Sequence, residues 1–261
     1  MEAKNIVYYS SEPNEPQAIF PNVSLNRDEI PNWDKYPFSI PAIQGMEKLE
    51  LHPKVTFLVG ENGSGKSTLI EGIAVKAGFN PEGGSRDFNF STRASHSELY
   101  KFLELSRPTR KINDWYFLRA ESFYNVSTEI ENLRVSGYGP KSLHEQSHGE
   151  AFLALAMNRF KGRGFYIMDE PESALSPARQ IALLYMIHKL VHEMESQIII
   201  STHSPILLAY PESRIYQLSD AGIHESSYEE TEHFRITHDF LQNRETYMRN
   251  IMQIDQGTLD L

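Results

Sequence analysis

The chain has 261 residues, 40% of them hydrophobic, and a formal net charge of −10 at pH 7. This length is enough to bury a substantial core, and the absence of cysteine excludes disulfide bonds and thiolate metal sites. The negative charge argues against a surface that coats nucleic acid through counterion release alone. No leader pattern opens the chain and no apolar run reaches the roughly 18 residues of a membrane span, so we expect a cytoplasmic protein with no transmembrane segment.

The N-terminal part predicts irregular structure followed by two strands. Residues 1–45 are rich in proline and asparagine, which is typical of irregular segments with short edge strands. In the stretch MEKLELHPKVTFLVG, Leu49 and Leu51 alternate with charged residues, and a nearly all-apolar run at 55–59 follows a turn. The first pattern predicts a half-buried strand and the second a strand inside a sheet.

A glycine-rich loop and a helix follow the second strand. The sequence GENGSGKST fits G-x-x-x-x-G-K-[ST], and we expect the helix to run from Lys66 to Ala77 and to end at Gly78. The loop can gather backbone N–H groups around phosphates, Lys66 can reach the terminal phosphates, and Ser67 can bind Mg²⁺. A chance glycine-rich turn is the alternative, which the strand before and the helix after it disfavour. The expected nucleotide-binding residues are Gly60, Asn62, Gly63, Ser64, Gly65, Lys66, Ser67 and Thr68.

Strands and helices alternate in the rest of the chain. Short, strongly apolar runs predict buried strands at 115–120, 165–169 and 197–202. The clearest helix begins at Ser176-Pro177. One face of this helix carries Ile181, Leu184, Ile187, Leu190, Val191 and Met194.

These elements predict one α/β domain over residues 1–261, with the fold of a P-loop NTPase. We expect a mostly parallel central sheet flanked by helices, with an antiparallel β edge. Residues 98–146 predict an inserted small lobe that is mainly helical, and residues 214–261 predict a C-terminal hairpin and helix.

An acidic pair and a histidine follow two of the predicted strands. Asp169 can hold Mg²⁺ while Glu170 orients or deprotonates the attacking water. An isolated acidic pair at a strand end is usually a solvated terminus, but a preceding phosphate loop favours function. His203 in IIISTHSP can hydrogen-bond the γ phosphate or the water, although a lone histidine is more often structural. The expected catalytic residues are therefore Glu170, His203 and Lys66.

The order of these motifs resembles that of the ATP-binding-cassette ATPases over about residues 46–220. The resemblance rests on 60–68 as Walker A, 165–170 as Walker B, 173–176 as the D-loop and His203 as the switch histidine. It implies ATP and Mg²⁺ as cofactors.

The stretch SLHEQSHGEAFL falls where that family keeps its signature loop. Ser147, Gly149 and Glu150 replace the family's Leu-Ser-Gly-Gly-Gln, and the resemblance implies that they contact a nucleotide held by a second copy. Their S-x-x-E spacing also predicts a helix cap. The two roles are compatible, because a capped helix N-terminus is itself an anion site.

Two departures from transporter cassettes narrow the resemblance. The segment RAES makes Glu121 the counterpart of the usual glutamine and Arg119 a neighbour that could contact phosphate, and THSP replaces Thr-His-Asp. Both features are similar to the ATPases of chromosome maintenance, repair and phage defence, and to small stand-alone bacterial predicted ATPases of that branch.

We therefore expect an ATPase that forms a head-to-tail homodimer around two Mg-ATP and acts on DNA or a separate effector protein. The alternatives are the nucleotide-binding subunit of a membrane transporter and an ATP sensor that does not hydrolyse.

Two smaller sets of residues allow two interpretations each. The basic clusters at 107–111 and 159–163 fit solvated turns or phosphate-contacting patches, and charge pattern alone favours solvated turns. Tyr36 and Phe38 are suitably spaced before the loop to contact adenine, but we favour packing in the core for both.

Overall fold

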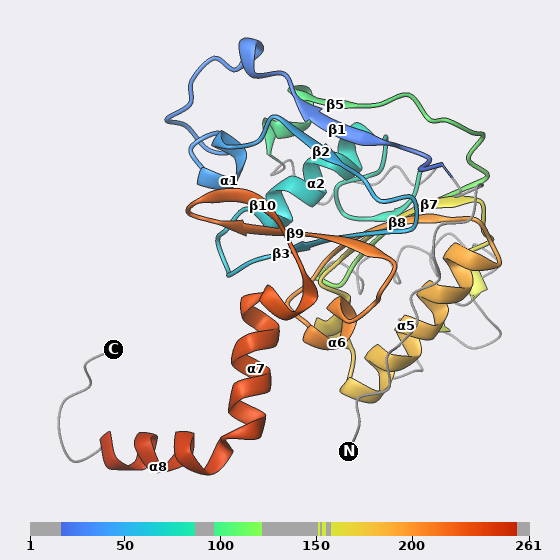
Figure 1. Ribbon diagram of the computed structural model, residues 1–261. Helices are drawn as coiled ribbons and strands as arrows, with labels where there is room; N and C mark the ends of the chain where they lie inside the picture. The colour runs from blue at the N-terminus through green and yellow to red at the C-terminus, as the bar shows by residue number, and fades with distance from the viewer. Residues whose placement is uncertain (1–16, 87–96, 122–150, 152, 155–157, 255–261) are drawn as a thin grey trace.

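The computed structural model describes residues 17–86, 97–121, 151, 153–154 and 158–254, and the structural statements below concern these residues. A seven-stranded sheet with the order β10-β9-β3-β8-β7-β6-β4 forms its centre (Figure 1). Its strands are β3 (Val55–Val59), β4 (Gly84–Ser85), β6 (Asp114–Arg119), β7 (Gly164–Asp169), β8 (Gln197–Ser201), β9 (Ser213–Ser219) and β10 (Gly222–Ser226).

The five inner strands from β9 to β6 are parallel, and β10 and β4 pair antiparallel at the two edges. The sequences of the inner strands are continuous apolar runs, because side chains on both faces of this sheet are buried. Every residue of β3, β7 and β8 is buried. The mostly parallel α/β fold with an antiparallel edge is thus confirmed.

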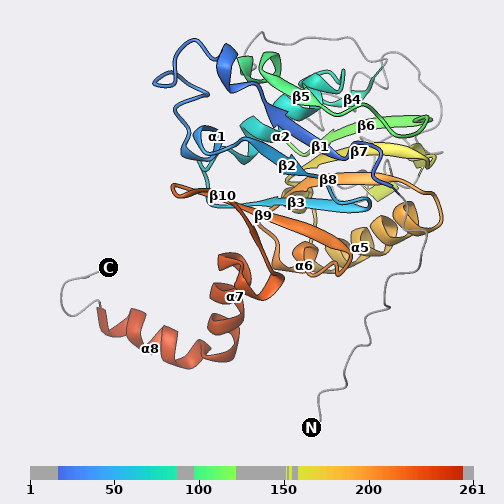
Figure 2. The same ribbon diagram turned by 45° about the horizontal axis from the view of Figure 1, so that its top comes forward.

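A second, antiparallel sheet of three strands covers one face of the molecule. It has the order β2-β1-β5, with β1 (Asn22–Leu25), β2 (Lys48–Glu50) and β5 (Leu103–Leu105). The helix α2 (Lys66–Lys76) lies between the two sheets (Figure 2), and its apolar residues share one buried cluster with strands of both. The N-terminal strand β1 is central in its sheet, with partners on both sides, and not an edge strand as the sequence suggested.

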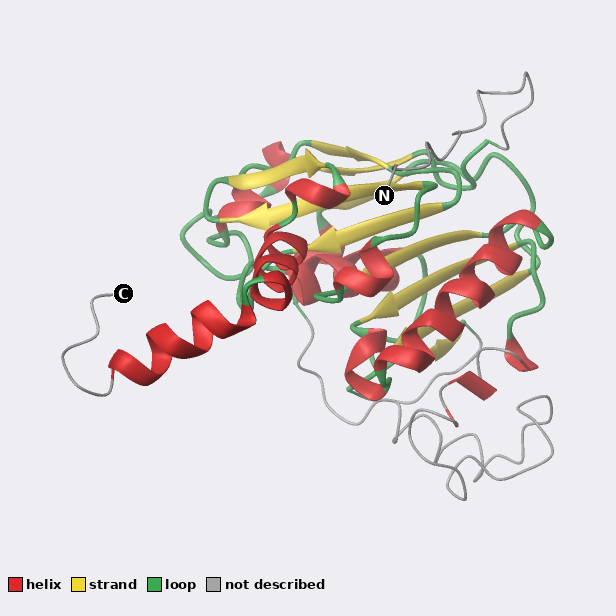
Figure 3. Cartoon of the chain, turned by 60° about the horizontal axis from the view of Figure 1, so that its bottom comes forward, coloured by secondary structure: helices red, strands yellow, loops and turns green. Residues whose placement is uncertain are grey.

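The opposite face of the large sheet carries α5 (Pro177–His192) and α6 (Pro205–Leu208) (Figure 3). α5 begins at Ser176-Pro177 as predicted, and Ile187, Leu190 and Val191 of the predicted face are buried. Leu184 and Met194 pack against the same core, but Ile181 is 61% exposed, and Leu183 and Met186 are buried in addition. Apolar residues extend beyond one stripe of this helix, so packing against the sheet decides which edge of the stripe is covered.

The prediction of a mainly helical lobe at 98–146 is wrong for the part that the structure describes. Residues 98–121 form the 3₁₀ helix η2 (Glu98–Lys101), β5 and β6. β5 is fixed by pairing with β1, about 80 residues away in the chain, which local periodicity does not reveal. Residues 122–146 lie outside the described residues.

The C-terminal hairpin β9–β10 forms as expected, but the single terminal helix is two helices. α7 (Glu232–Gln242) and α8 (Arg244–Ile254) meet at Asn243, whose side-chain amide donates to Asp239 over 2.6 Å. Both extend away from the main body (Figures 1 and 3), and they expose Ile236, Leu241, Ile251 and Met252. Across the described ranges, helices long and apolar enough to cross a bilayer are absent.

The remaining short elements connect these layers. They are η1 (Arg27–Glu29), α1 (Pro41–Gln44), η4 (Pro171–Ala174) and η5 (Tyr228–Glu230).

Candidate nucleotide site

Three loops meet at the carboxyl edge of the large sheet because their strands are parallel neighbours. The register pairs Leu58 of β3 with Ser201 of β8, and Ser201 with Asp169 of β7. The glycine-rich loop, the acidic pair and His203 each begin within two residues of these positions. The structure therefore brings together residues that lie more than 100 positions apart in the sequence.

Close backbone contacts explain two of the loop's glycines. A Cβ atom on Gly60 would lie 2.3 Å from the carbonyl oxygen of Leu218 in β9. Gly65 has a φ of 98°, caps the N-terminus of α2, and would bring a Cβ to 2.8 Å from Ile40 Cγ2. A side chain at position 60 would push the loop away from β9, and one at position 65 would push it away from Ile40, the residue before α1.

Lys66 is buried inside this loop with 3% of its surface exposed. Its ammonium donates to the carbonyl oxygens of Gly60 over 2.7 Å and Glu61 over 3.1 Å. Burial lowers the pKa of Lys66, and the carboxylates of Glu170 and Asp169 oppose that shift. A phosphate entering the loop would offer the ammonium a charged acceptor in place of two neutral carbonyls.

Three hydroxyl groups of the loop and of the first turn of α2 differ in their hydrogen-bond partners. Ser64 Oγ is buried and lacks a hydrogen-bond partner in the described part of the chain. Ser67 is half-buried on the first turn of α2. Thr68 Oγ1 lies 3.2 Å from the hydroxyl of Tyr36.

Asp169 ends β7 in a buried, polar setting. Ser201 Oγ donates to its Oδ1 over 2.5 Å, and Arg119 Nε lies 3.4 Å from its Oδ2. Burial raises the pKa of Asp169, and Ser201 and Arg119 oppose this rise. Sequence reasoning missed Ser201, although its place at the end of the adjacent strand was a usable signal.

Arg119 is held by three carboxylates rather than free to contact phosphate. Besides Asp169, it pairs with Glu71 of α2 over 2.8 Å and approaches Glu121 to 3.6 Å. Glu121 itself has 86% of its side chain exposed, just beyond the end of β6. The guanidinium therefore ties α2 to β7 under the site.

Glu170 has an unusual backbone conformation, with φ 48° and ψ 52°. This left-handed conformation costs a non-glycine residue about 1–2 kcal/mol, and such residues cluster at functional sites. The Glu170 amide is held by the Ser201 carbonyl over 3.1 Å, and its Oε1 lies 3.3 Å from His203 Nε2. The backbone N–H of His203 donates to Glu172 Oε1 over 2.5 Å, so a third carboxylate, not predicted, fixes the histidine loop.

A second histidine joins the site from the C-terminal helix. His233 Nε2 of α7 lies 3.0 Å from His203 Nδ1, and 3.9 Å from Glu61 Oε1. The sequence analysis did not identify His233, because it lies 30 residues beyond His203 in no recognisable motif.

The two predicted aromatic residues differ in burial, and the predicted signature residues are not among those that the structure describes. Phe38 is buried against Phe102, as expected for core packing, but that prediction is wrong for Tyr36, which is 65% exposed. Ser147, Gly149 and Glu150 lie outside the described residues.

Acidic partners engage several residues of the two basic clusters. Arg159 pairs with Asp114 over 2.7 Å, and Arg163 pairs with Glu195 over 3.2 Å. Arg110 donates to the Glu195 carbonyl over 2.6 Å. These contacts favour the structural interpretation of the clusters.

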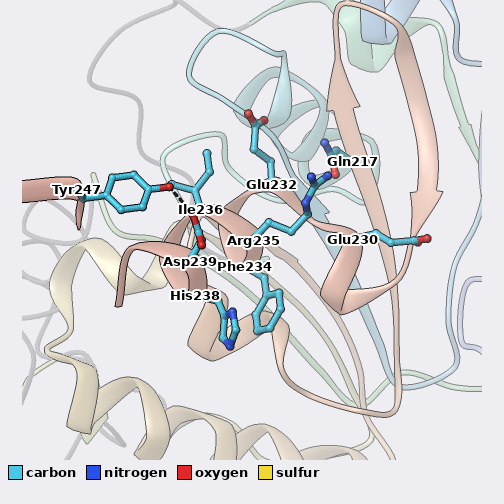
Figure 4. A pocket seen from close by; sticks show the side chains of 9 residues that line it. All are labelled: Gln217, Glu230, Glu232, Phe234, Arg235, Ile236, His238, Asp239 and Tyr247. Carbon is cyan, nitrogen blue, oxygen red and sulfur yellow. Dashed lines mark hydrogen bonds between the residues drawn. The ribbon is translucent and has the colours of Figure 1, made fainter. Parts of the chain in front are cut away.

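A groove of about 600 Å³ runs along α7 and is lined by residues of β9, η5, α7 and α8 (Figure 4). Tyr247 of α8 points toward Asp239 there and donates to it over 2.5 Å. The groove's carboxylates, Glu230, Glu232 and Asp239, outnumber its one guanidinium, that of Arg235. These carboxylates would repel a triphosphate, so the groove is a poor candidate for the nucleotide site.

Comparisons with known proteins show which families and relatives the chain is similar to. Residues 32–146 match the family described as AAA domain, and residues 150–209 match the family described as AAA domain, putative AbiEii toxin, Type IV TA system. A putative ABC transporter ATP-binding protein of Clostridium acetobutylicum is 24% identical over 183 residues, which cover 64% of this chain and 66% of that protein. The thiamine import ATP-binding protein ThiQ of a Chelativorans species is 28% identical over 196 residues, covering 66% and 76%. The solved structure of cbiO1 from Clostridium perfringens, part of the ABC transporter complex cbiONQ, has a TM-score of 0.47 at 15% identity and covers 89% and 99% of the two chains.

The phosphate loop, the acidic pair and the histidine at one sheet edge define a P-loop ATPase. The matched families and relatives support, more narrowly, an ATPase of the ATP-binding-cassette type.

Proposed function

We propose that the chain binds Mg-ATP at the carboxyl edge of the sheet and hydrolyses it in a site that a second copy completes. Backbone N–H groups of residues 60–65 would surround the phosphates, and the Lys66 ammonium would exchange the Gly60 and Glu61 carbonyls for them. The observation that carries this proposal is the burial of Lys66 near two carboxylates, with its ammonium donating to the carbonyls of Gly60 and Glu61 in its own loop.

The oxygen donors of the site suit Mg²⁺. Ser67 lies in the first turn of α2 beside the proposed phosphate position, and Asp169 ends the strand β7. A hydroxyl and a carboxylate are the hard ligands that this ion prefers. Once bound, the ion would neutralise charge on the phosphates, while Ser201 and Arg119 keep the Asp169 carboxylate oriented.

Glu170 is the proposed base, and His203 the proposed hydrogen-bond donor to the γ phosphate. The left-handed backbone of Glu170 turns its carboxylate to within 3.3 Å of His203 Nε2, so both groups face one point. From there Glu170 can orient or deprotonate water as it attacks the phosphorus, and His203 can donate to a phosphate oxygen as charge develops.

Tyr36 is the proposed contact of the adenine ring. Its ring is exposed, and its hydroxyl is held beside Thr68 at the end of the phosphate loop. An aromatic face in this position offers a base a stacking surface without reading its edges.

The second copy is proposed to contribute Ser147, Gly149 and Glu150 across the dimer interface. The sequence order of the motifs supports this arrangement, in which two chains enclose two Mg-ATP.

Two outputs of the cycle remain proposals. Action on DNA or on an effector protein is supported by Glu121 and the THSP segment, which depart from the transporter pattern. Service as the nucleotide-binding subunit of a membrane transporter is supported at least as well, because the relatives named above are transporter ATP-binding proteins. The engaged arginines of the basic clusters give DNA binding no added support.

Light scattering of a Glu170→Gln protein tests the core of the proposal. This variant retains the buried lysine and should trap Mg-ATP, so its solution mass should double when Mg-ATP is added and return to that of one chain when Ser147→Arg is also present. A mass that Mg-ATP leaves unchanged would contradict the shared site. A Glu170→Gln protein that hydrolyses ATP at the wild-type rate would contradict the base.

A further inference from the structure

The helix α7 places the ring of His233 beside the ring of His203, on the side of its Nδ1 atom. The two rings have their centroids 5.1 Å apart, and His203 Nδ1 lies 3.0 Å from His233 Nε2. The side chain of His233 is only 12% exposed. Its position is fixed at the start of α7, where the neighbouring Thr231 is fully buried and donates its hydroxyl to the Tyr228 carbonyl over 2.7 Å.

Two neutral imidazoles at this distance can share one proton in only two ways. Either His233 donates from Nε2 to His203 Nδ1, or His203 donates from Nδ1 to His233 Nε2. In the first case the proton of His203 sits on Nε2, and in the second it sits on Nδ1 and leaves a lone pair on Nε2.

The surroundings favour the first arrangement at both rings. Glu170 Oε1 lies 3.3 Å from His203 Nε2, so an acceptor faces the His203 proton, and the His233 proton is directed at His203 Nδ1. His233 Nδ1 is buried without a partner among the described residues. An orphaned lone pair there is more tolerable than an orphaned N–H, which the second arrangement would create.

The surroundings of His233 favour its neutral form, which this arrangement requires. Burial lowers its pKa, and the neighbouring His203 and Lys66 act in the same direction, while Glu61 and Glu232 oppose them. Glu170 and Glu172 complete the charged groups on the His203 side.

We propose that His233 is a positioning residue that holds His203 in the tautomer with its proton on Nε2, so that His203 presents an N–H donor to the γ phosphate. The proposal rests on the proposed role of His203. His203 Nε2 is buried and makes no well-aligned hydrogen bond in the described part of the chain, so that N–H is available to a phosphate oxygen. The wrong tautomer would instead aim a lone pair at the negatively charged phosphate. His233 lies in α7, outside the segment that carries the sequence motifs, and it fixes the tautomer of His203.

The test compares four substitutions at His233 in steady-state ATP hydrolysis by the full-length chain. His233→Ala removes the donor, and kcat should fall about tenfold with KM for ATP changed less than about threefold, as for other groups that orient an active imidazole. His233→Gln restores an N–H donor and should recover most of the rate. His233→Glu can only accept and reverses the tautomer, so it should be slower than His233→Ala, whereas His233→Leu should match His233→Ala. His238→Ala, an exposed histidine one turn along the same helix, is the control and should keep the wild-type rate.

A double substitution and NMR separate positioning from a structural effect. His203→Ala with His233→Ala should be no slower than His203→Ala alone, because the second residue acts only through the first. Nitrogen-15 spectra of labelled histidine should show the Nε2–H form of His203 in wild type and in His233→Gln, and a mixture of tautomers in His233→Ala.

The outcomes distinguish two failures. If His203→Ala keeps the wild-type rate, the proposed role of His203 is wrong and the inference fails with it. If His203→Ala is slow but His233→Ala hydrolyses normally, or if the double variant is slower than His203→Ala by the full His233→Ala factor, only the role of His233 is wrong.

Discussion

Replacing Arg119 by leucine should destabilise the protein more than the loss of any ordinary surface arginine. The guanidinium lies between Glu71, at 2.8 Å, and Asp169, at 3.4 Å, which have 14% and 6% of their side chains exposed. Removing the cation leaves both carboxylates with little solvent to replace it. Arg119 also donates to the Pro81 carbonyl over 3.2 Å, a bond that leucine loses.

The size of the effect follows from burial. Breaking a buried ion pair by removing one partner costs about 3–5 kcal/mol, and partial solvent access to Glu71 argues for the lower end, about 3 kcal/mol. For a chain of this size that loss corresponds to a fall in Tm of roughly 6–12 °C. Arg163→Leu is the matched control, because Arg163 also pairs with one glutamate but has 64% of its side chain exposed, so its loss should cost under about 1 kcal/mol.

The pH dependence of the difference gives a second check. Burial already raises the pKa of Asp169, and Arg119 opposes that rise, so the variant should raise it further. When a carboxyl group has a higher pKa in the folded than in the unfolded protein, the free energy of unfolding falls as pH rises through the folded-state pKa. The deficit of Arg119→Leu should therefore be largest near about pH 8 and shrink toward about pH 5. Urea unfolding at both pH values measures it, and a deficit equal to that of Arg163→Leu, or one that grows on acidification, would refute the reasoning.

Two further predictions concern the nucleotide. Gly60→Ala should abolish ATP binding in calorimetry and lower the free energy of unfolding by about 1–3 kcal/mol, because its Cβ would lie 2.3 Å from the Leu218 carbonyl oxygen. Gly63→Ala has open space around its Cβ, so it should cost only the roughly 1–2 kcal/mol of its positive φ. Equal effects of the two substitutions would contradict this argument. Tyr36→Ala should weaken ATP binding about fivefold or more through lost stacking, and Tyr36→Phe should not; an unchanged affinity in Tyr36→Ala would remove Tyr36 from the adenine site.

The sequence predicted the parts of the site that depend on short spacings. The phosphate loop, Asp169, Glu170 and His203 each follow a strand made of a continuous apolar run, and parallel strands deliver such residues to one edge. The buried face of α5 was largely predicted, except that Ile181 is exposed and Leu183 and Met186 are buried. The strand β5 was not predictable in this way, because it is a strand only through its pairing with β1.

His233 shows why the rest of the site was out of reach of local patterns. Its neighbourhood reads as the first turn of an amphipathic surface helix, and a half-buried histidine there has no periodic signature. What brings it to His203 is long-range packing: β9 lies parallel to β3, β10 runs back antiparallel to β9, and the segment after β10 then places the start of α7 beside His203 and Glu61. The same register puts Leu218 of β9 against Gly60. Because α7 follows β10 in the chain, an insertion or deletion in the β9–β10 hairpin should disturb His203 through His233 while leaving the motif residues themselves unchanged in sequence.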